Sequence, residues 1–108
     1  MRTDSELVQD ILEAVDKIEK YSVEGRDRFV TDELVQVWML HYLQLLGEAV
    51  RILSSDFKDR HLEIPWSKII GMRNILVHSY FGIDLDAVWA VVEKDLPILK
   101  SRLKNLAP

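Results

Sequence analysis

Apolar residues recur at helical spacing in four stretches of this chain, and each stretch predicts one helix. The first runs from about residue 5 to 21, with polar residues between the apolar ones. A spacing of three or four residues places apolar side chains on one face of a helix. The predicted buried face consists of Leu7, Ile11, Ala14 or Val15, and Ile18. Thr3 with Glu6 fits a capping box at its start, and Ser5 is an alternative cap.

The pattern breaks between residues 22 and 28, where Gly25 is the expected stop. A long second helix is expected to begin just after Gly25, or at Thr31 or Asp32, and to continue to about residue 54. The residues expected to form its apolar stripe are Leu34, Trp38, Leu45, Ala49 and Ile52, with Val37 and Leu53 beside them. The polar residues from 54 to 63 are expected to form a helix end or a connector.

Proline, glycine and aspartate residues mark the limits of the two remaining helices. The third is expected to start at Pro65, which suits the first helical position, and to run toward Tyr80, with Gly82 as its stop. Asp84 is the expected cap of the fourth helix. Its apolar residues are Leu85, Val88, Trp89, Val92, Leu96, Leu99 and Leu103. Pro97 removes one backbone donor and predicts a kink between residues 93 and 97.

These segments predict an all-α fold, an up-and-down bundle of four helices. No stretch of the sequence alternates apolar and polar residues as a half-buried strand would. The chain has 108 residues, of which 48% are hydrophobic and 30% charged, a balance typical of a folded helical protein. Since no linker or repeat divides it, residues 1–108 are expected to form a single domain.

Charge and cysteine content narrow the kinds of site that this chain can carry. The net charge of −4 speaks mildly against a nonspecific nucleic-acid binder, although a small local cationic site is compatible with it. The absence of cysteine rules out disulfides and thiolate zinc sites. The first six residues do not resemble a leader, and no apolar run is long enough to span a bilayer. A cytoplasmic location is therefore the expectation.

Four residues with complementary chemistry lie close together at the end of the third predicted helix: Arg73, Asn74, His78 and Tyr80. Cleaving RNA without a metal requires a base for the 2′-hydroxyl, an acid for the leaving oxygen and a cation for the charged phosphorane. Histidine can be the base or the acid near neutral pH, and arginine presents a permanently charged fork to phosphate oxygens. Tyrosine can donate a hydrogen bond, and asparagine can orient the imidazole.

Helix geometry qualifies this interpretation. At about 100° per residue, Asn74 and His78 share one face, and Arg73 and Tyr80 share another. Arg73 and His78 lie roughly 140° apart around an ideal helix. They can meet at one phosphate only if the helix loosens near His78, or if a second copy of the chain completes the site. The second option predicts a symmetric homodimer with two motifs facing one cleft.

The run from Arg73 to Tyr80 resembles the signature of the HEPN ribonucleases, which is an arginine, four to six residues, and then His-any-Tyr. Ser79 occupies the free position, where this family often has Asp. The resemblance to the HepT-like branch of this family extends along nearly the whole chain. The matching elements are Gly47-Glu48-Ala49, Ile64-Pro65-Trp66, Gly71-Met72-Arg73-Asn74, Asp84-Leu85 to Trp89, and Asp95-Leu96-Pro97.

This resemblance implies a HEPN-type bundle and a specific function. HepT-like proteins are dimeric toxins that cleave RNA, and each is paired with a minimal nucleotidyltransferase antitoxin in a type VII toxin–antitoxin system. It implies a metal-independent endoribonuclease that leaves 2′,3′-cyclic phosphate ends and acts on RNA, not DNA. The implied catalytic residues are Arg73, His78 and Tyr80, with Asn74 in support. The antitoxin would transfer AMP to Tyr80, which would block the approach of a phosphate.

Each of these residues also has an ordinary structural interpretation. His78 suits a helix end in its charged form, and Tyr80 could be a core aromatic residue with its hydroxyl at the surface. Arg73 lies on a partly apolar stripe, so it is either paired internally, with Glu48 as the best candidate, or directed into a functional cleft. The other histidines, His41 and His61, form no recognised metal-ligand pattern with the motif.

Two other functions compete with the ribonuclease. A non-catalytic helical module could bind nucleotide or assist a partner nucleotidyltransferase, and the acidic pI suits it at least as well. Such modules generally lack the complete signature. A plain structural four-helix dimer would explain Trp38, Trp66 and Trp89 as core or interface anchors, but it leaves the cluster of Arg, Asn, His and Tyr unexplained.

Overall fold

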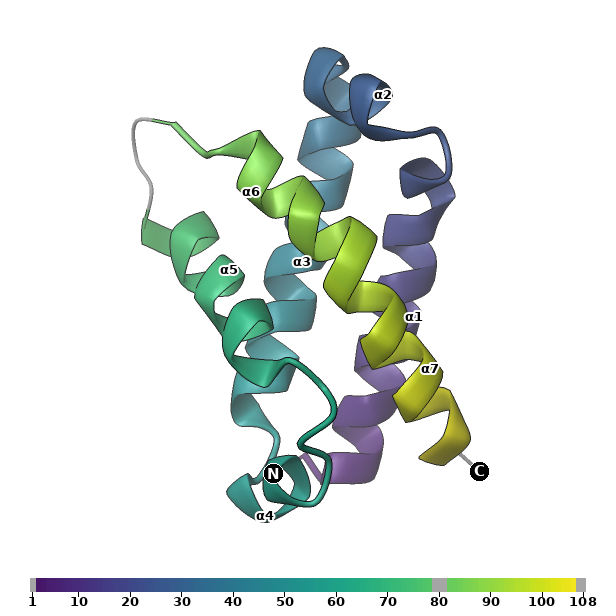
Figure 1. The fold of residues 1–108 in the computed structure, drawn as a ribbon, viewed down its shortest axis with the longest axis vertical. Coiled ribbons are helices and arrows are strands. Elements are labelled where there is room, and N and C mark those ends of the chain that lie inside the picture. Colours follow the sequence, from purple (N-terminus) through teal and green to yellow (C-terminus); the bar gives the residue numbers. More distant parts are fainter. Residues whose placement is uncertain (1, 79–81, 107–108) are drawn as a thin grey trace.

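The structure, a computed structural model, describes residues 2–78 and 82–106. Four long helical segments alternate in direction along the bundle (Figure 1). They are α1 (Asp4–Ser22), α3 (Glu33–Ile52), α5 (Trp66–His78) and a last segment made of α6 (Leu85–Ala90), the π-helical turn η1 (Val91–Asp95) and α7 (Leu96–Leu106). Short helices α2 (Arg26–Thr31) and α4 (Ser55–Asp59) lie at opposite ends. The predicted all-α, up-and-down four-helix bundle is confirmed, and the described residues contain no strand.

The first helix follows its sequence pattern closely. The Thr3 side chain accepts a hydrogen bond from the backbone of Glu6, and the Glu6 side chain accepts one from the backbone of Thr3, which is the predicted capping box. All five predicted apolar positions of α1 are buried, including both Ala14 and Val15. Its other face is polar, so only one face of this helix can pack against the core.

Both predicted starts of the second long helix are used, because the chain forms two helices there. Gly25 has a φ of 95°, which favours glycine, and α2 begins directly after it. Asp32 is extended, and its carboxylate accepts hydrogen bonds from the backbone amides of Leu34 and Val35. Asp32 therefore ends α2 and caps α3.

The residues predicted to form the buried face of α3 are largely wrong. Leu34, Val37, Leu45 and Ile52 are exposed, Trp38 is half-buried, and of that set Ala49 and Leu53 are buried. The core face of α3 is instead formed by Val35, Met39, Leu43, Leu46 and Val50. Both sets have helical spacing, so periodicity alone did not decide between them. The helix is apolar on two sides, and its neighbours bury only one.

The two remaining segments start close to their predicted positions. Helix α5 begins directly after Pro65, and Gly82 has a φ of 156°, a value that other residues rarely adopt. The predicted end of α5 near Tyr80 lies outside the described residues. Asp84 caps α6 as predicted, accepting from the backbone of Asp86 and Ala87.

The expected irregularity before Pro97 is a π-helical turn, η1, over residues 91–95. A proline cannot donate to the helical ladder, and an inserted π turn is one way to accommodate the gap. Helix α7 continues beyond it, and Leu96, Leu99 and Leu103 remain in the core. No helix among residues 2–78 and 82–106 combines the length and the apolar character needed to cross a membrane.

Candidate functional site

Arg73 is anchored against α3 by a carboxylate. Its guanidinium lies 2.7 Å from the Glu48 carboxylate, which confirms the predicted internal pairing. The Arg73 side chain is only 20% exposed, whereas that of Glu48 is 38% exposed. The arginine therefore lies in the crevice between α3 and α5, with its partner at the outer edge.

Gly47 makes this position possible. A Cβ atom added at Gly47 would lie 2.4 Å from Cβ and 2.7 Å from Cγ of Arg73, which is far inside contact distance. Nothing larger than glycine fits between the helices while Arg73 keeps its place. Two neighbouring residues of α3 therefore hold Arg73 in place. Gly47 allows its side chain to pack against the α3 backbone, and Glu48 binds its guanidinium.

A second arginine shares the same carboxylate. Arg51 donates to one Glu48 oxygen at 2.7 Å and to the second at 3.3 Å, and Arg73 contacts this second oxygen. Hydrogen bonding from Arg51, reinforced by the charges of Arg51 and Arg73, holds the pKa of the Glu48 carboxyl below its ordinary value. We refer to Arg73, Glu48 and Arg51 as the Arg73 cluster. Two guanidinium groups around one carboxylate leave a local excess of positive charge, although the whole chain is acidic.

The remaining nitrogens of Arg73 differ in their surroundings. One terminal nitrogen donates to the Asn74 side-chain oxygen at 3.2 Å. The Nε atom is buried and has no hydrogen-bond partner within the described part of the chain. An unsatisfied donor on a charged group is costly to bury, so its presence beside an exposed neighbour such as Asn74 is typical of a functional site.

The rest of the motif follows Arg73 along α5. The helix is regular through His78, so the backbone does not loosen between positions 73 and 78. The side chain of His78 and the whole of Tyr80 lie outside the described residues, as does Ser79. The structure therefore brings Arg73, Asn74 and Glu48 together and does not test the geometry of His78 and Tyr80.

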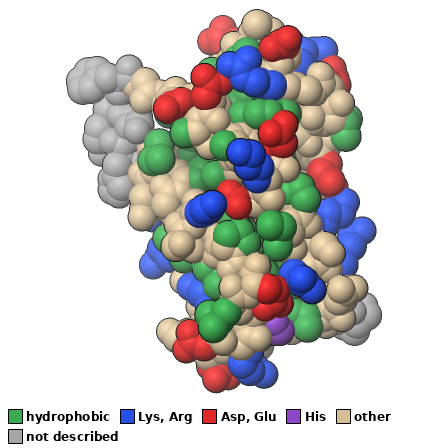
Figure 2. Space-filling view, in the orientation of Figure 1, with side chains coloured by type: hydrophobic (Ala, Val, Ile, Leu, Met, Phe, Trp, Pro, Cys, Tyr) green, Lys and Arg blue, Asp and Glu red, His purple; other side chains and the backbone are tan. Residues whose placement is uncertain are grey.

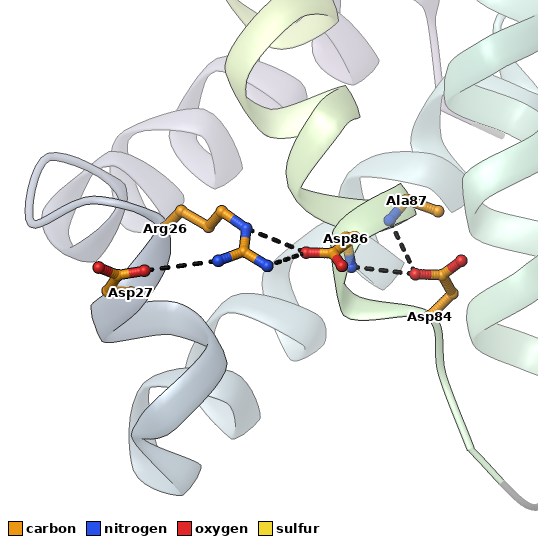
Figure 3. A network of polar contacts seen from close by, with 5 residues as sticks. All are labelled: Arg26, Asp27, Asp84, Asp86 and Ala87. Atoms are coloured by element: carbon orange, nitrogen blue, oxygen red, sulfur yellow. Dashed lines mark hydrogen bonds and ion pairs between the residues drawn. The ribbon is translucent and has the colours of Figure 1, made fainter.

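A second arginine cluster holds the chain where it returns to the bundle after the motif. Arg26 at the start of α2 pairs with Asp86 in the first turn of α6 and lies 3.4 Å from Asp27 (Figure 3). Asp84 caps the same turn. We refer to Arg26, Asp27 and Asp86 as the Arg26 cluster. It attaches the residues after the motif to the opposite end of the bundle from α4.

One hollow lies beside α5, which carries Arg73, and another lies beside α3, which carries Glu48. One, of about 420 Å³, lies between α5 and the α6–η1 segment, with Lys68 and Lys94 at its edge and Ile75 in its wall. The other, of about 380 Å³, lies between α1 and α3, with Leu45, Ala49 and Ile52 in its wall and Glu48 at its edge. The Arg73 cluster therefore borders the second hollow.

The other histidines take no part in this cluster. His41 is exposed on α3, and its ring contacts that of Tyr42. His61 follows α4 and contacts the ring of Phe57. Among residues 2–78 and 82–106, no three side chains of the His, Asp and Glu types gather closely enough to hold a metal ion.

The sequence over residues 11–106 matches a family model described as "Ribonuclease HepT-like". The match covers α1 from residue 11 onward, the other long helices and the whole Arg73-to-Tyr80 run. The chain belongs to the HepT-like ribonuclease family. Membership in a family of ribonucleases supports an RNase function for this chain.

Curated relatives of this HepT-like chain agree with the assignment. A protein of Thermococcus cleftensis, named "Probable ribonuclease HepT", is 36% identical over 106 residues, which span 97% of this chain and 96% of the relative. "Putative RNase TTE0752" of Caldanaerobacter subterraneus is 31% identical over 98% of this chain and 96% of its own length. No solved structure matches the chain.

Two features of this HepT-like site were not predicted from the sequence. Arg51 shares Glu48 with Arg73, and the spacing of Glu48 and Arg51, three residues apart on one helix, was the signal that could have revealed it. Gly47 is required by contact with Arg73, which lies 26 positions further along the chain. No local pattern contains that information.

Proposed function

We propose that this HepT-like protein is a metal-independent endoribonuclease, the toxin of a type VII toxin–antitoxin pair. The observation that carries the proposal is the Arg73 cluster. It holds a largely buried guanidinium, with net positive charge around it, on the same helix that leads into His78 and Tyr80. An acidic protein that anchors a cation in this way has prepared a local site for an anion such as an RNA phosphate.

The proposed reaction is an internal transfer at phosphorus. His78 removes the proton of the 2′-hydroxyl, the 2′-oxygen attacks the neighbouring phosphorus, and the bond to the 5′-oxygen breaks. The proton that His78 accepted is then returned to that leaving oxygen, and the products carry a 2′,3′-cyclic phosphate and a 5′-hydroxyl. Arg73 stabilises the charge on the phosphorane, and Tyr80 donates a hydrogen bond to it. Histidine can also serve as the acid, so His78 is assigned as base or acid.

Asn74 and Glu48 are supporting residues in this scheme. Glu48 keeps Arg73 in place from one side, and the Asn74 amide oxygen accepts from Arg73 on the other. A guanidinium held at two points loses little freedom when it binds a phosphate, which favours the charged transition state. Asn74 is one helical turn before His78, a spacing that also allows it to orient the imidazole.

The proposal includes a homodimer, because one helix does not make the site. Since α5 is regular from Arg73 through His78, these positions lie about 140° apart around its axis. A second copy can supply the missing partner, so that Arg73 of one chain and His78 of the other act on the same phosphate. Two such sites would lie in one cleft across a two-fold axis.

The other partner in the proposal is a minimal nucleotidyltransferase antitoxin that attaches AMP to Tyr80. A phosphate-linked AMP at the motif would place a bulky anion where the RNA phosphate has to bind. We also propose that residues 1–108 form one HepT-like domain. The described apolar residues form one continuous core from Leu7 to Leu103, which supports this division.

Cleavage of RNA in EDTA tests the proposal. We expect the wild-type protein to cleave RNA and to leave 2′,3′-cyclic phosphate ends, and His78→Ala to lose activity by about 10²-fold or more. The matched control is His61→Ala, which removes a histidine outside the motif. Circular dichroism establishes that both variants keep the helical content of the wild type.

Two outcomes would contradict the proposal. Activity of folded His78→Ala equal to that of the wild type would remove His78 from the mechanism. Tight ATP binding with no cleavage of any RNA by the wild type would favour the non-catalytic nucleotide-binding module instead.

A further inference from the structure

One face of α3 carries large apolar side chains in contact with solvent. Leu34 is 81% exposed, Val37 63%, Leu45 51% and Ile52 49%. Burying such residues is favourable, so a long exposed row of them indicates a surface that another molecule covers. We call Leu34, Val37, His41, Leu45, Glu48 and Ile52 the α3 stripe.

The α3 stripe is a continuous line along the helix. At 100° per residue, positions 34, 41, 45 and 52 lie within about 20° of one direction, and positions 37 and 48 border them. The exposed apolar residues Val23, Leu62 and Ile98 are scattered over other segments. Figure 2 shows the face made by α5, α6 and α7, where charges of both signs interrupt the apolar side chains. Helix α3 lies on the far side in that orientation.

We propose that a second copy of this chain binds the α3 stripe, with the two α3 helices antiparallel across a two-fold axis near Leu43. The inference deepens the proposed function, because it names the surface that would bring two motifs together. The role of this surface in bringing two motifs together rests on the proposed function. The surface itself is identified from the exposed apolar side chains of α3 alone.

The order of residues in the α3 stripe is self-complementary for antiparallel packing. With the axis at position 43, Leu34 of one copy faces Ile52 of the other, and Leu45 faces the stem of His41. Apolar side chains then meet at both ends of the contact, and Leu45 lies against His41 near the centre. The same patch on both copies forms an isologous interface, as a two-fold axis requires.

Parallel packing of the two α3 helices is disfavoured by electrostatic repulsion. A parallel two-fold pair would place Glu48 of one copy opposite Glu48 of the other. The pKa of this carboxyl is already held low by the arginines, so both groups would be ionised at neutral pH. Like charges opposed in an interface are unfavourable. In the antiparallel pair, Glu48 instead faces the region of Val37 and Trp38.

Antiparallel packing also places the two motifs on the same side of the dimer. Helix α5 lies on one side of the α3 stripe, where Arg73 packs on Gly47, and α1 lies on the other side. A two-fold axis perpendicular to both α3 helices keeps the two α5 helices together. Gly47 is four positions from the axis, so the two Arg73 anchors would be offset by about 12 Å along α3. Both motifs would then face the same side of the dimer.

The available area is sufficient for a stable pair. From Leu34 to Ile52 the α3 stripe is about 27 Å long. A contact two helix diameters wide along that length covers about 600 Å² on each chain, near the lower limit for a specific protein interface. The hollow of about 380 Å³ beside Leu45 and Ile52 provides room for side chains of the partner.

A charge placed in the α3 stripe tests the surface. We expect the wild-type protein to sediment as a dimer at micromolar concentration and Leu45→Glu to sediment as a monomer with unchanged helical content. The matched control is Ile98→Glu on α7, where the residue is 40% exposed, and this variant should remain a dimer. A second stripe variant, Leu34→Glu, has Leu62→Glu as its control, since these residues are 81% and 77% exposed.

Cysteine cross-linking tests the orientation, and it is simple because the chain has no cysteine of its own. A mixture of Leu34→Cys and Ile52→Cys proteins should form a covalent pair with a short dithiol-reactive cross-linker. Leu34→Cys alone should not, because its two copies would be about 27 Å apart in the antiparallel dimer. Efficient cross-linking of Leu34→Cys alone would overturn the antiparallel arrangement.

The outcomes separate this inference from the proposed function. A Leu45→Glu variant that stays dimeric would refute the α3 interface whatever the RNA cleavage assay shows, and a monomeric wild-type protein would refute both the interface and the shared site of the proposed function. Loss of cleavage in His78→Ala would still support the ribonuclease in either case. A dimeric wild type without ribonuclease activity would leave the interface supported and the proposed function contradicted.

Discussion

The two arginine clusters use the same kind of ion pair and have opposite charge balances. In the Arg26 cluster one arginine lies between two aspartates, and all three side chains are well exposed, from 48% for Arg26 to 96% for Asp27. In the Arg73 cluster two arginines share one glutamate, and Arg73 itself is only 20% exposed. Figure 3 shows the first cluster at the start of α6, where it links two short helical ends.

This difference distinguishes an exposed ion-pair network from the cluster that we propose as an anion-binding site. In the Arg26 cluster two carboxylates surround one guanidinium, so its positive charge is more than neutralised. Exposed ion pairs of this kind contribute little to the free energy of folding. The Arg73 cluster retains positive charge and a buried, unsatisfied Nε within the described residues. A buried donor without a partner is costly, and this cost together with the positive charge supports the proposed role of Arg73 in binding an anion.

Removal of each arginine in turn should show the largest contrast. We expect Arg73→Ala to lower RNA cleavage by about 10²–10³-fold, as for loss of a group that stabilises charge in the transition state. Arg26→Ala should leave cleavage within about twofold of the wild type, because its charge is already neutralised. A cleavage assay on both folded variants measures the difference. Equal losses in the two variants would remove the distinction between the clusters.

Two glycines on neighbouring helices should respond in opposite directions to alanine. Gly47→Ala introduces a Cβ 2.4 Å from that of Arg73, and we expect a loss of about 1–3 kcal/mol in the free energy of unfolding. Gly71→Ala meets no atom within 4 Å and should gain about 0.5–1 kcal/mol from helix propensity. Urea denaturation compares them. A stabilising Gly47→Ala would mean that Arg73 is not held by this contact.

The helix cap beside the Arg26 cluster should matter more than the ion pair. Asp84→Ala removes an acceptor for two backbone amides of α6, and we expect a loss of about 1 kcal/mol in the free energy of unfolding. Asp86→Asn, which weakens only the exposed pair with Arg26, should have a smaller effect. Thermal unfolding of both variants checks the order. A larger loss of stability in Asp86→Asn than in Asp84→Ala would show that the exposed ion pairs of the Arg26 cluster contribute substantially to folding.

The smallest expected effect is on substrate affinity through Glu48. The pKa of the Glu48 carboxyl is lowered in the folded protein, so the pairing contributes fully above the unfolded pKa and is lost only as the pH falls through the lower folded pKa. The KM for RNA should therefore show no change from Glu48 titration between pH 7 and 5. Glu48→Gln should raise KM by up to about fivefold and change kcat less. A KM that rises steeply in the wild type near pH 6, and not in Glu48→Gln, would contradict this assignment.

The sequence predicted most of the bundle because most of its helices are amphipathic on one side. The apolar residues of α1 and of the last segment could face only one way, and Thr3, Asp84 and Pro97 marked their limits. Helix α3 was assigned the wrong face because apolar residues line both of its sides. Which side is buried depends on the packing of its neighbours, and no single segment contains that information.

The sequence named the candidate residues, and the structure confirms one of the contacts expected among them. Arg73 and Glu48 were correctly paired, since a charge on a partly apolar stripe needs a carboxylate within reach. The participation of Arg51 and the steric requirement for Gly47 depend on how closely α3 and α5 approach, which is a tertiary property. The geometry of His78 and Tyr80 remains a prediction.

Mixing two inactive variants tests the central claim, a site shared between two chains, most directly. Arg73→Ala and His78→Ala proteins are each expected to be inactive, and they are unfolded and refolded together so that subunits exchange. Half of the dimers would then be mixed, and one of the two sites in each mixed dimer would have both residues intact. The account predicts recovery of about one quarter of the wild-type cleavage activity. No recovery in dimers shown to have exchanged would contradict it.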